Sequence, residues 1–190
     1  SLGKHDKAME NHQQALALFR KLGNEDGIAS SFLSIGQVYN SQDQYDKAME
    51  NYQQALAIFR KLGKEDAIAT ALNNIGLMYN SLGQYDKAIE IYQQALAIAR
   101  RLGKEEMIAS SLEKIGVVYR SLGQLDKAMD NFQQALTLYR KLGKEDKITL
   151  SIIHIGAVYS SRGQYDKAME NYQQALAIAR KLGKEEMIAL

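Results

Sequence analysis

The chain has 190 residues, in which 24 lysines and arginines nearly balance 22 aspartates and glutamates, for a formal net charge of +2. A nucleic-acid-binding protein normally carries a basic stripe, and these charges are spread along the chain, so we expect no nucleic-acid partner. The absence of cysteine, proline and tryptophan excludes disulfides and thiolate metal sites, and it leaves a composition that favours helices.

No apolar run approaches the roughly 18 to 20 residues that a membrane-spanning helix needs, and no signal peptide opens the chain. We therefore expect a soluble protein that works in the cytoplasm and has no membrane partner. The sequence begins with Ser1 instead of methionine, which indicates a segment excised from, or processed out of, a longer protein.

The sequence repeats with a period of 40 residues and without gaps. For example, SQDQYDKAMENYQQALAIFRKLGKED from position 41 aligns with SLGQYDKAIEIYQQALAIARRLGKEE from position 81. A fixed period of this size is typical of solenoids, in which helical units stack on their neighbours. In chain order, the sequence predicts a lone first helix over about 5–21, helix pairs over about 25–61, 65–101, 105–141 and 145–181, and the start of a further helix at 185–190.

The ends of these helices carry chemical signals. In the first helix of a period, Asp46 lies near the positive end of the helix dipole and Arg60 near the negative end. Gly63 follows, and glycine readily adopts the left-handed conformation that closes a helix. Because short turns join helices of about 16 residues, we expect neighbouring helices to pack antiparallel.

A glycine recurs in the middle of every second helix, where it costs roughly 1 kcal/mol relative to alanine. The facing first helix carries two alanines seven positions apart, such as Ala48 and Ala55. Small residues on facing helices allow close approach of the backbones, so we interpret the glycines as packing contacts. They are Gly36, Gly76, Gly116 and Gly156.

Together these residues resemble the tetratricopeptide repeat signature. In the third period the signature positions are Ile115, Gly116, Tyr119, Gly123, Leu125, Ala128, Phe132 and Ala135. The resemblance covers the whole chain and implies an all-α fold, a right-handed superhelical α-solenoid of antiparallel helix pairs. The family's usual repeat has about 34 residues, so this form resembles the 40-residue repeats of Pins-type adaptors and of bacterial and archaeal arrays. Asp43 replaces a turn glycine and Leu125 an aromatic residue, which are local variations.

Equivalent positions of the four second helices differ only where their structural role leaves freedom. The invariant isoleucines, glycines and tyrosines recur at helical spacing and predict the packed face. The remaining positions, three and four residues apart, share another face, which we call the variable face and expect to be unpacked. Its members are Ser30, Leu33, Ser34, Gln37, Asn40, Thr70, Asn73, Asn74, Leu77, Asn80, Ser110, Glu113, Lys114, Val117, Arg120, Leu150, Ile153, His154, Ala157 and Ser160.

The family resemblance implies that the variable face lines a concave groove that holds an extended peptide or a helix. Apolar members such as Leu33, Leu77 and Ile153 favour a binding surface, whereas the alternative is simple tolerance of exposed positions. The amides of Asn73 and Asn74 can both donate and accept hydrogen bonds with a peptide backbone. The carboxylate clamp of some family members matches only in part, because Leu33 stands where that clamp needs lysine.

Nothing in the sequence predicts an enzyme, a cofactor or a metal site. The three histidines, His5, His12 and His154, lack a paired carboxylate or a second histidine at metal-ligand spacing. Acidic pairs such as Glu105 and Glu106 fall at helix starts, where the helix dipole already explains them. We therefore predict a protein-interaction scaffold.

Two alternatives remain open. The first helix lacks a preceding partner, and the last carries Tyr165 and Met169, which resemble interior residues. This end would suit further repeats or a second copy stacked head to tail, so a structural or self-assembling module is one alternative. A regulatory segment of a larger multidomain enzyme or signalling protein is the other. Near-identical repeats would also suit a designed or recently duplicated array.

Overall fold

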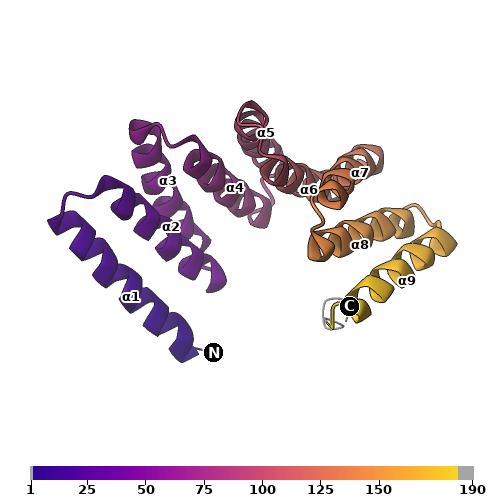
Figure 1. Ribbon diagram of the computed structural model, residues 1–190, viewed down its shortest axis with the longest axis horizontal. Coiled ribbons are helices and arrows are strands. Elements are labelled where there is room, and N and C mark those ends of the chain that lie inside the picture. The colour runs from indigo at the N-terminus through magenta and orange to yellow at the C-terminus, as the bar shows by residue number, and fades with distance from the viewer. Residues whose placement is uncertain (1, 184–190) are drawn as a thin grey trace. The chain divides into compact units, whose positions relative to one another are not determined.

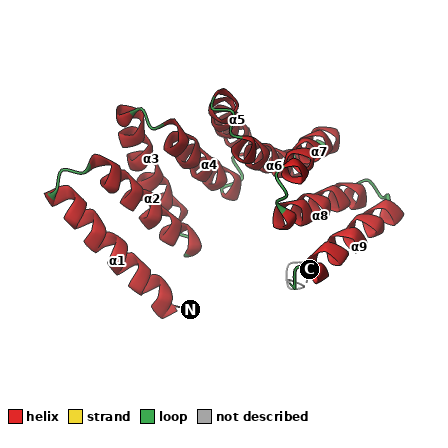
Figure 2. Cartoon of the chain, in the orientation of Figure 1, coloured by secondary structure: helices red, strands yellow, loops and turns green. Residues whose placement is uncertain are grey.

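The computed structural model describes residues 2–183, with the side chains from residue 6 onward. The predicted helix start at 185–190 and the side chain of His5 lie outside the described residues. Within that range the chain is helical and has no strand, and short turns join the helices (Figures 1 and 2). The helices are α1 (Leu2–Lys21), α2 (Glu25–Ser41), α3 (Tyr45–Leu62), α4 (Glu65–Ser81), α5 (Tyr85–Arg101), α6 (Glu105–Ser121), α7 (Leu125–Lys141), α8 (Glu145–Ser161) and α9 (Tyr165–Lys181).

Contacts divide the chain into two compact units, Ser1–Ile98 and Ala99–Leu190, with the boundary inside α5. In unit 1, α2 packs against α1 and α3, and α3 packs against α4. In unit 2, α7 packs between α6 and α8, α8 packs against α9, and α6 also contacts α8. Within each unit, consecutive helices from α1 to α4 and from α6 to α9 thus pack on one another, as a solenoid requires. The prediction of one continuous right-handed superhelix over both units stays a prediction.

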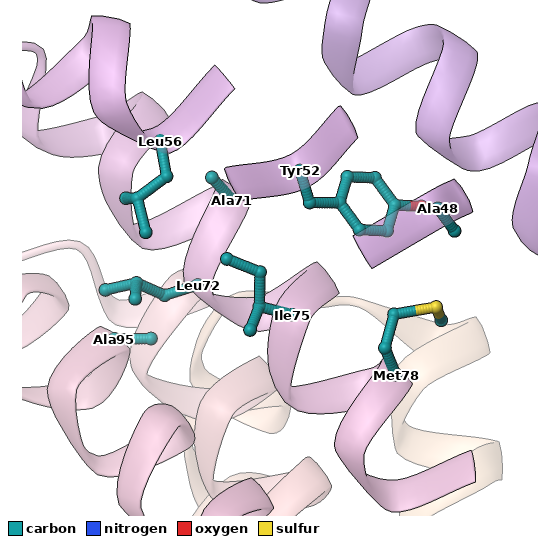
Figure 3. Close-up of a cluster of buried hydrophobic side chains, with 8 residues drawn as sticks. All are labelled: Ala48, Tyr52, Leu56, Ala71, Leu72, Ile75, Met78 and Ala95. Atoms are coloured by element: carbon teal, nitrogen blue, oxygen red, sulfur yellow. The ribbon is translucent and has the colours of Figure 1, made fainter. Parts of the chain in front are cut away.

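The core of unit 1 shows how the repeat buries its apolar residues. Figure 3 shows one cluster, in which Tyr52 and Leu56 come from α3, Leu72 and Met78 from α4, and Ala95 from α5. Full burial of a large aliphatic side chain stabilises a fold by about 1.5 to 3 kcal/mol. The stability of each unit therefore comes mainly from repeated contacts between neighbouring helices.

The helical glycines are packing contacts, as predicted, but their partner is an aromatic ring. A Cβ atom on Gly36 would lie 2.6 Å from the Tyr52 ring, and one on Gly116 would lie 2.7 Å from the Phe132 ring. The alanines Ala48 and Ala55 are fully buried nearby in the same helix pair. The ring of each following helix thus lies directly on the glycine backbone.

Left-handed residues close the turns. Gly63 has φ 66°, and Asp43 has φ 57° where other periods have glycine. Asp43 Oδ1 accepts a hydrogen bond from the Tyr45 hydroxyl at 2.9 Å. Aspartate tolerates this conformation better than most residues, so the replacement changes the turn only locally.

Charged contacts recur with the period as well. Glu25 pairs with Lys61 in unit 1, and Glu105 pairs with Lys141 in unit 2. Lysine ammonium groups also lie over tyrosine rings of the preceding helix at 5.2 to 5.5 Å from the ring centroids. Exposed pairs of this kind contribute little each, typically up to about 1 kcal/mol. They reinforce helix packing that burial already determines.

Candidate functional site

The variable face occupies one strip on each of α2, α4, α6 and α8. In unit 1 it comprises five positions on α2 and five on α4, and in unit 2 five on α6 and five on α8. Ser30, Gln37 and Thr70 are exposed, and most of the other members are half-buried. The structure therefore leaves accessible polar groups on this face of each unit.

Parts of the variable face are packed, which corrects the expectation that it is free. Leu33 and Leu77 pack against the hydrophobic core of unit 1. In unit 2, Ile153 is only 8% exposed and Glu113 only 6%. The position held by Leu33, Glu113 and Ile153 lies at the edge of the helix-packing interface, so the apolar character of Leu33 and Ile153 is explained by packing and is no evidence for a ligand.

The amides of α4 stand out among the half-buried members. Asn73 Oδ1, Asn74 Nδ2 and Asn80 Oδ1 are each buried and have no hydrogen-bond partner. A buried polar atom without a partner costs about 1 to 3 kcal/mol. Such groups are rare in native proteins, and three on one helix face therefore require an explanation.

Glu113 has a partner that the sequence did not single out. The Tyr139 hydroxyl on α7 donates a hydrogen bond to Glu113 Oε2 at 3.0 Å, inside the packed interface. In the first period, the equivalent positions hold Leu33 and Phe59. In the third period, Glu113 thus replaces leucine and Tyr139 replaces phenylalanine. This paired change in the sequence could have predicted the contact.

His154 has a carboxylate neighbour in space, although none stands at metal-ligand spacing in the sequence. His154 Nδ1 on α8 lies 3.6 Å from Glu113 Oε1 on α6. The His154 ring lies against the Phe132 ring, with centroids 4.8 Å apart and the planes tilted by 33°. The two residues are one period and one residue apart in sequence, a spacing that brings them together only because α6 and α8 are in contact.

Burial dominates the electrostatics of this cluster. It raises the pKa of Glu113, while Lys147, the Tyr139 hydroxyl and Lys114 act in the opposite direction. The pKa of His154 is lowered to about 4, first by burial and then by the charge of Arg120. His154 is therefore neutral at neutral pH.

Lys114 is a further charged residue of α6 close to Glu113. Burial lowers its pKa, Glu113 opposes that effect, and Lys147 adds to it. Its ammonium group donates a hydrogen bond to Ser110 Oγ at 3.0 Å. The variable face of unit 2 therefore carries cations around one buried carboxylate, whereas the same face of unit 1 carries no charged residue.

Between residues 2 and 183, no three histidine, aspartate, glutamate or cysteine side chains gather in a way that would hold a metal ion. None of the helices in that range is both long and apolar enough to cross a bilayer. The chemistry that this face offers is hydrogen bonding and charge.

Comparison with solved structures identifies the architecture. The chain is 27% identical to BtubC (BKLC) from P. vanneervenii, with a TM-score of 0.83 over 95% of this chain and 75% of that one. The TPR-like repeats of a kinesin light chain of Podosopora anserina are 22% identical, with a TM-score of 0.71 over 95% and 89% of the two chains. A Rap protein complexed with Competence and Sporulation Factor is 21% identical, with a TM-score of 0.87.

The match to that Rap protein covers 98% of this chain but only 52% of the Rap chain, so this chain spans about half of its length. No curated protein matches the chain. Family models described as Tetratricopeptide repeat match residues 1–61, 67–141 and 149–182. These matches cover most of the sequence, and the chain belongs to the tetratricopeptide repeat family.

Proposed function

We propose that this chain is a protein-interaction scaffold that binds a peptide or a helix of another protein through the variable faces of α2, α4, α6 and α8. The observation that carries the proposal is the set of unpartnered amide atoms on α4, Asn73 Oδ1, Asn74 Nδ2 and Asn80 Oδ1. The Rap protein that was solved in complex with Competence and Sporulation Factor supports it, because it shares the fold.

The amides suit a peptide because an extended backbone alternates donors and acceptors. Asn73 and Asn80 each have an unsatisfied acceptor, and Asn74 has an unsatisfied donor. A peptide N–H and C=O next to this face would supply the missing partners after small side-chain rotations. Binding would thereby remove a cost that the unbound chain carries.

The test starts from linear peptides selected from a random displayed library against the whole chain. Asn73→Leu with Asn74→Ser installs the residues of the first period, Leu33 and Ser34, and should weaken the selected peptides by about tenfold or more. Calorimetry measures the affinity, and thermal unfolding should show a variant at least as stable as the unmodified chain, because two unsatisfied amide atoms are removed.

The matched control replaces Gln53 and Gln54, both exposed on α3, with alanine. It should leave peptide affinity unchanged. Equal affinity of the N73L/N74S variant and the unmodified chain would rule out α4 as the binding face.

A second candidate function is self-association through α9. Tyr165 is 71% exposed and Met169 is 58% exposed, whereas the equivalent Tyr45 and Met49 of α3 are half-buried. An apolar face of this kind favours contact with another copy.

Sedimentation equilibrium tests this function. The mass of the unmodified chain should rise with concentration, whereas a Tyr165→Ser, Met169→Gln variant should keep the mass of a monomer. A monomer at every concentration of the unmodified chain would exclude this function.

Two finer assignments belong to the same proposal. The period of 40 residues supports the extended repeat type found in Pins-type adaptors. The balanced charge and the lack of cysteine are compatible with a cytoplasmic scaffold. A fluorescent fusion observed in the source cells tests the location.

A further inference from the structure

Glu113, Tyr139 and His154 form the polar cluster of unit 2. Two of its atoms face each other without a hydrogen bond. Glu113 Oε1 and His154 Nδ1 lie 3.6 Å apart, and both are buried without a hydrogen-bond partner. That separation is too long for a hydrogen bond. A neutral imidazole carries its proton on only one nitrogen, so the position of the proton decides whether the two atoms attract or repel each other.

The surroundings hold both side chains in place. The Tyr139 hydroxyl of α7 donates to Glu113 Oε2, which leaves Oε1 as the free acceptor. The ring of Phe132, also on α7, lies against His154. The Nδ1 atom of His154 therefore faces Glu113 across a short gap between α6 and α8.

Burial disfavours the charged form of both groups, and the charges around the pair add to or oppose that effect. Lys114 and Lys147 favour the ionised carboxylate of Glu113 and oppose the effect of burial. Arg120 on α6 disfavours a charged imidazole at His154. With the carboxyl group of Glu113 ionised, which its hydrogen bond from the Tyr139 hydroxyl favours, the pair consists of a carboxylate acceptor and a neutral imidazole.

The two tautomers of this imidazole differ in whether Glu113 Oε1 and His154 Nδ1 can form a hydrogen bond. With the proton on Nε2, two lone pairs face each other in a buried site, and both acceptors stay unsatisfied. With the proton on Nδ1, a small rotation brings the N–H to Glu113 Oε1 and satisfies both atoms. Every 1.4 kcal/mol of difference corresponds to about a tenfold population ratio.

We propose that Glu113 is a positioning residue, which holds His154 as the Nδ1–H tautomer and thereby makes Nε2 a hydrogen-bond acceptor on the variable face of α8. The His154 side chain is 16% exposed although Nδ1 is buried, so the exposed area belongs to other atoms of this side chain. The matching ligand group is a hydrogen-bond donor, such as a backbone N–H, a hydroxyl or a primary amide of a bound peptide. This ligand assignment rests on the proposed function, whereas the tautomer does not.

Long-range proton–nitrogen correlation spectra of the ¹⁵N-labelled chain at pH 7 report which nitrogen of each imidazole is protonated. The chain has three histidines, and the His154→Asn variant assigns the signal of His154. We expect the Nδ1–H form to predominate by about tenfold or more. The Nε2–H form in the unmodified chain would overturn the proposal.

Matched variants test the role of Glu113. Glu113→Leu with Tyr139→Phe installs the pair found in the first period, Leu33 and Phe59, so the packed interface is kept. This double variant should shift His154 to a mixture of both tautomers, whereas Y139F alone should keep the Nδ1–H form. An unchanged spectrum in the double variant, with folding verified by thermal unfolding, would overturn the proposal.

The peptides selected against the chain test the second half of the inference. Peptides that contact unit 2 should bind the double variant about tenfold more weakly than they bind the Y139F variant. Equal affinity would overturn the recognition role of His154. Because the spectra are recorded without ligand, a failure to select any peptide would contradict the proposed function and leave the tautomer result intact.

Discussion

At the scale of single residues, the turn after α2 holds a left-handed aspartate where other turns use glycine. Asp43 has φ 57°, a conformation that costs a residue with a side chain about 1 kcal/mol and costs glycine little. We expect Asp43→Gly to stabilise unit 1 by about 0.5 to 1 kcal/mol, measured by urea unfolding. The loss of the exposed hydrogen bond from Tyr45 offsets only part of this gain.

The same variant changes the titration of Tyr45. The hydrogen bond to Asp43, followed by its negative charge, raises the pKa of Tyr45. Asp43→Gly should therefore bring that pKa back toward its ordinary value, as an ultraviolet titration would show. The reciprocal control is Gly83→Asp at the next equivalent turn, where φ is 70°, and it should destabilise the chain by a similar amount. A neutral effect of both variants would contradict the strain argument.

The buried pair Glu113 and Tyr139 is the other single-residue feature with a measurable energy. Y139F leaves Glu113 Oε2 without its donor, which should destabilise unit 2 by about 1 to 3 kcal/mol. Replacing both residues by the leucine and phenylalanine of the first period should be neutral or stabilising, because an apolar pair avoids the desolvation of a carboxylate. Urea unfolding of the two variants measures the contrast, and a double variant less stable than Y139F would contradict it.

At the scale of helices, the contact between a glycine and the next ring sets how closely two helices approach. A methyl group on Gly116 would overlap the Phe132 ring at 2.7 Å. Overpacking of this kind costs about 1 to 3 kcal/mol, and the gain in helix propensity returns at most about 1 kcal/mol. We expect Gly116→Ala to destabilise unit 2 by about 1 to 2 kcal/mol in thermal or urea unfolding.

The control for this prediction makes room for the added methyl group. In a Phe132→Leu background, the smaller side chain relieves the overlap, so Gly116→Ala should cost about 1 kcal/mol less than in the unmodified chain. Equal costs in the two backgrounds would show that the ring is not what requires the glycine.

These helix contacts also show what the sequence can and cannot predict. The helices and the packing role of Gly116 were predictable, because apolar spacing, turn glycines and a fixed period all indicate the same structure. That the partner would be the Phe132 ring depends on how two helices cross, which periodicity does not encode. The burial of Glu113 was missed for the same reason, since the variable face borders the packed interface.

At the scale of the whole molecule, the polar cluster of unit 2 should couple stability to pH. The pKa of His154 is about 4 in the folded chain, below the ordinary histidine value of 6.5. The unfolded chain therefore binds more protons between these two values, and folded stability falls as pH drops from about 6.5 to 4. A shift of this size corresponds to roughly 3 kcal/mol in total, of which about 2 kcal/mol are lost by pH 5.

Glu113 acts with the opposite sign. Because its pKa is raised in the folded chain, folding favours its protonation, and this offsets part of the loss as pH falls. A comparison between variants that differ only at residue 154 isolates the contribution of His154. His154→Asn does this, since asparagine occupies the equivalent position of α4 as Asn74.

Urea unfolding at pH 7 and pH 5 should show that the unmodified chain loses about 1 to 2 kcal/mol more than the H154N variant. Above pH 7 the difference in unfolding free energy between the two chains should no longer change with pH, because the imidazole is neutral whether the chain is folded or unfolded. An E113L/Y139F chain should lose more than the unmodified chain on acidification, because the compensating protonation of Glu113 is gone. Parallel losses in all three chains would show that His154 is not buried in solution as it is in this structure.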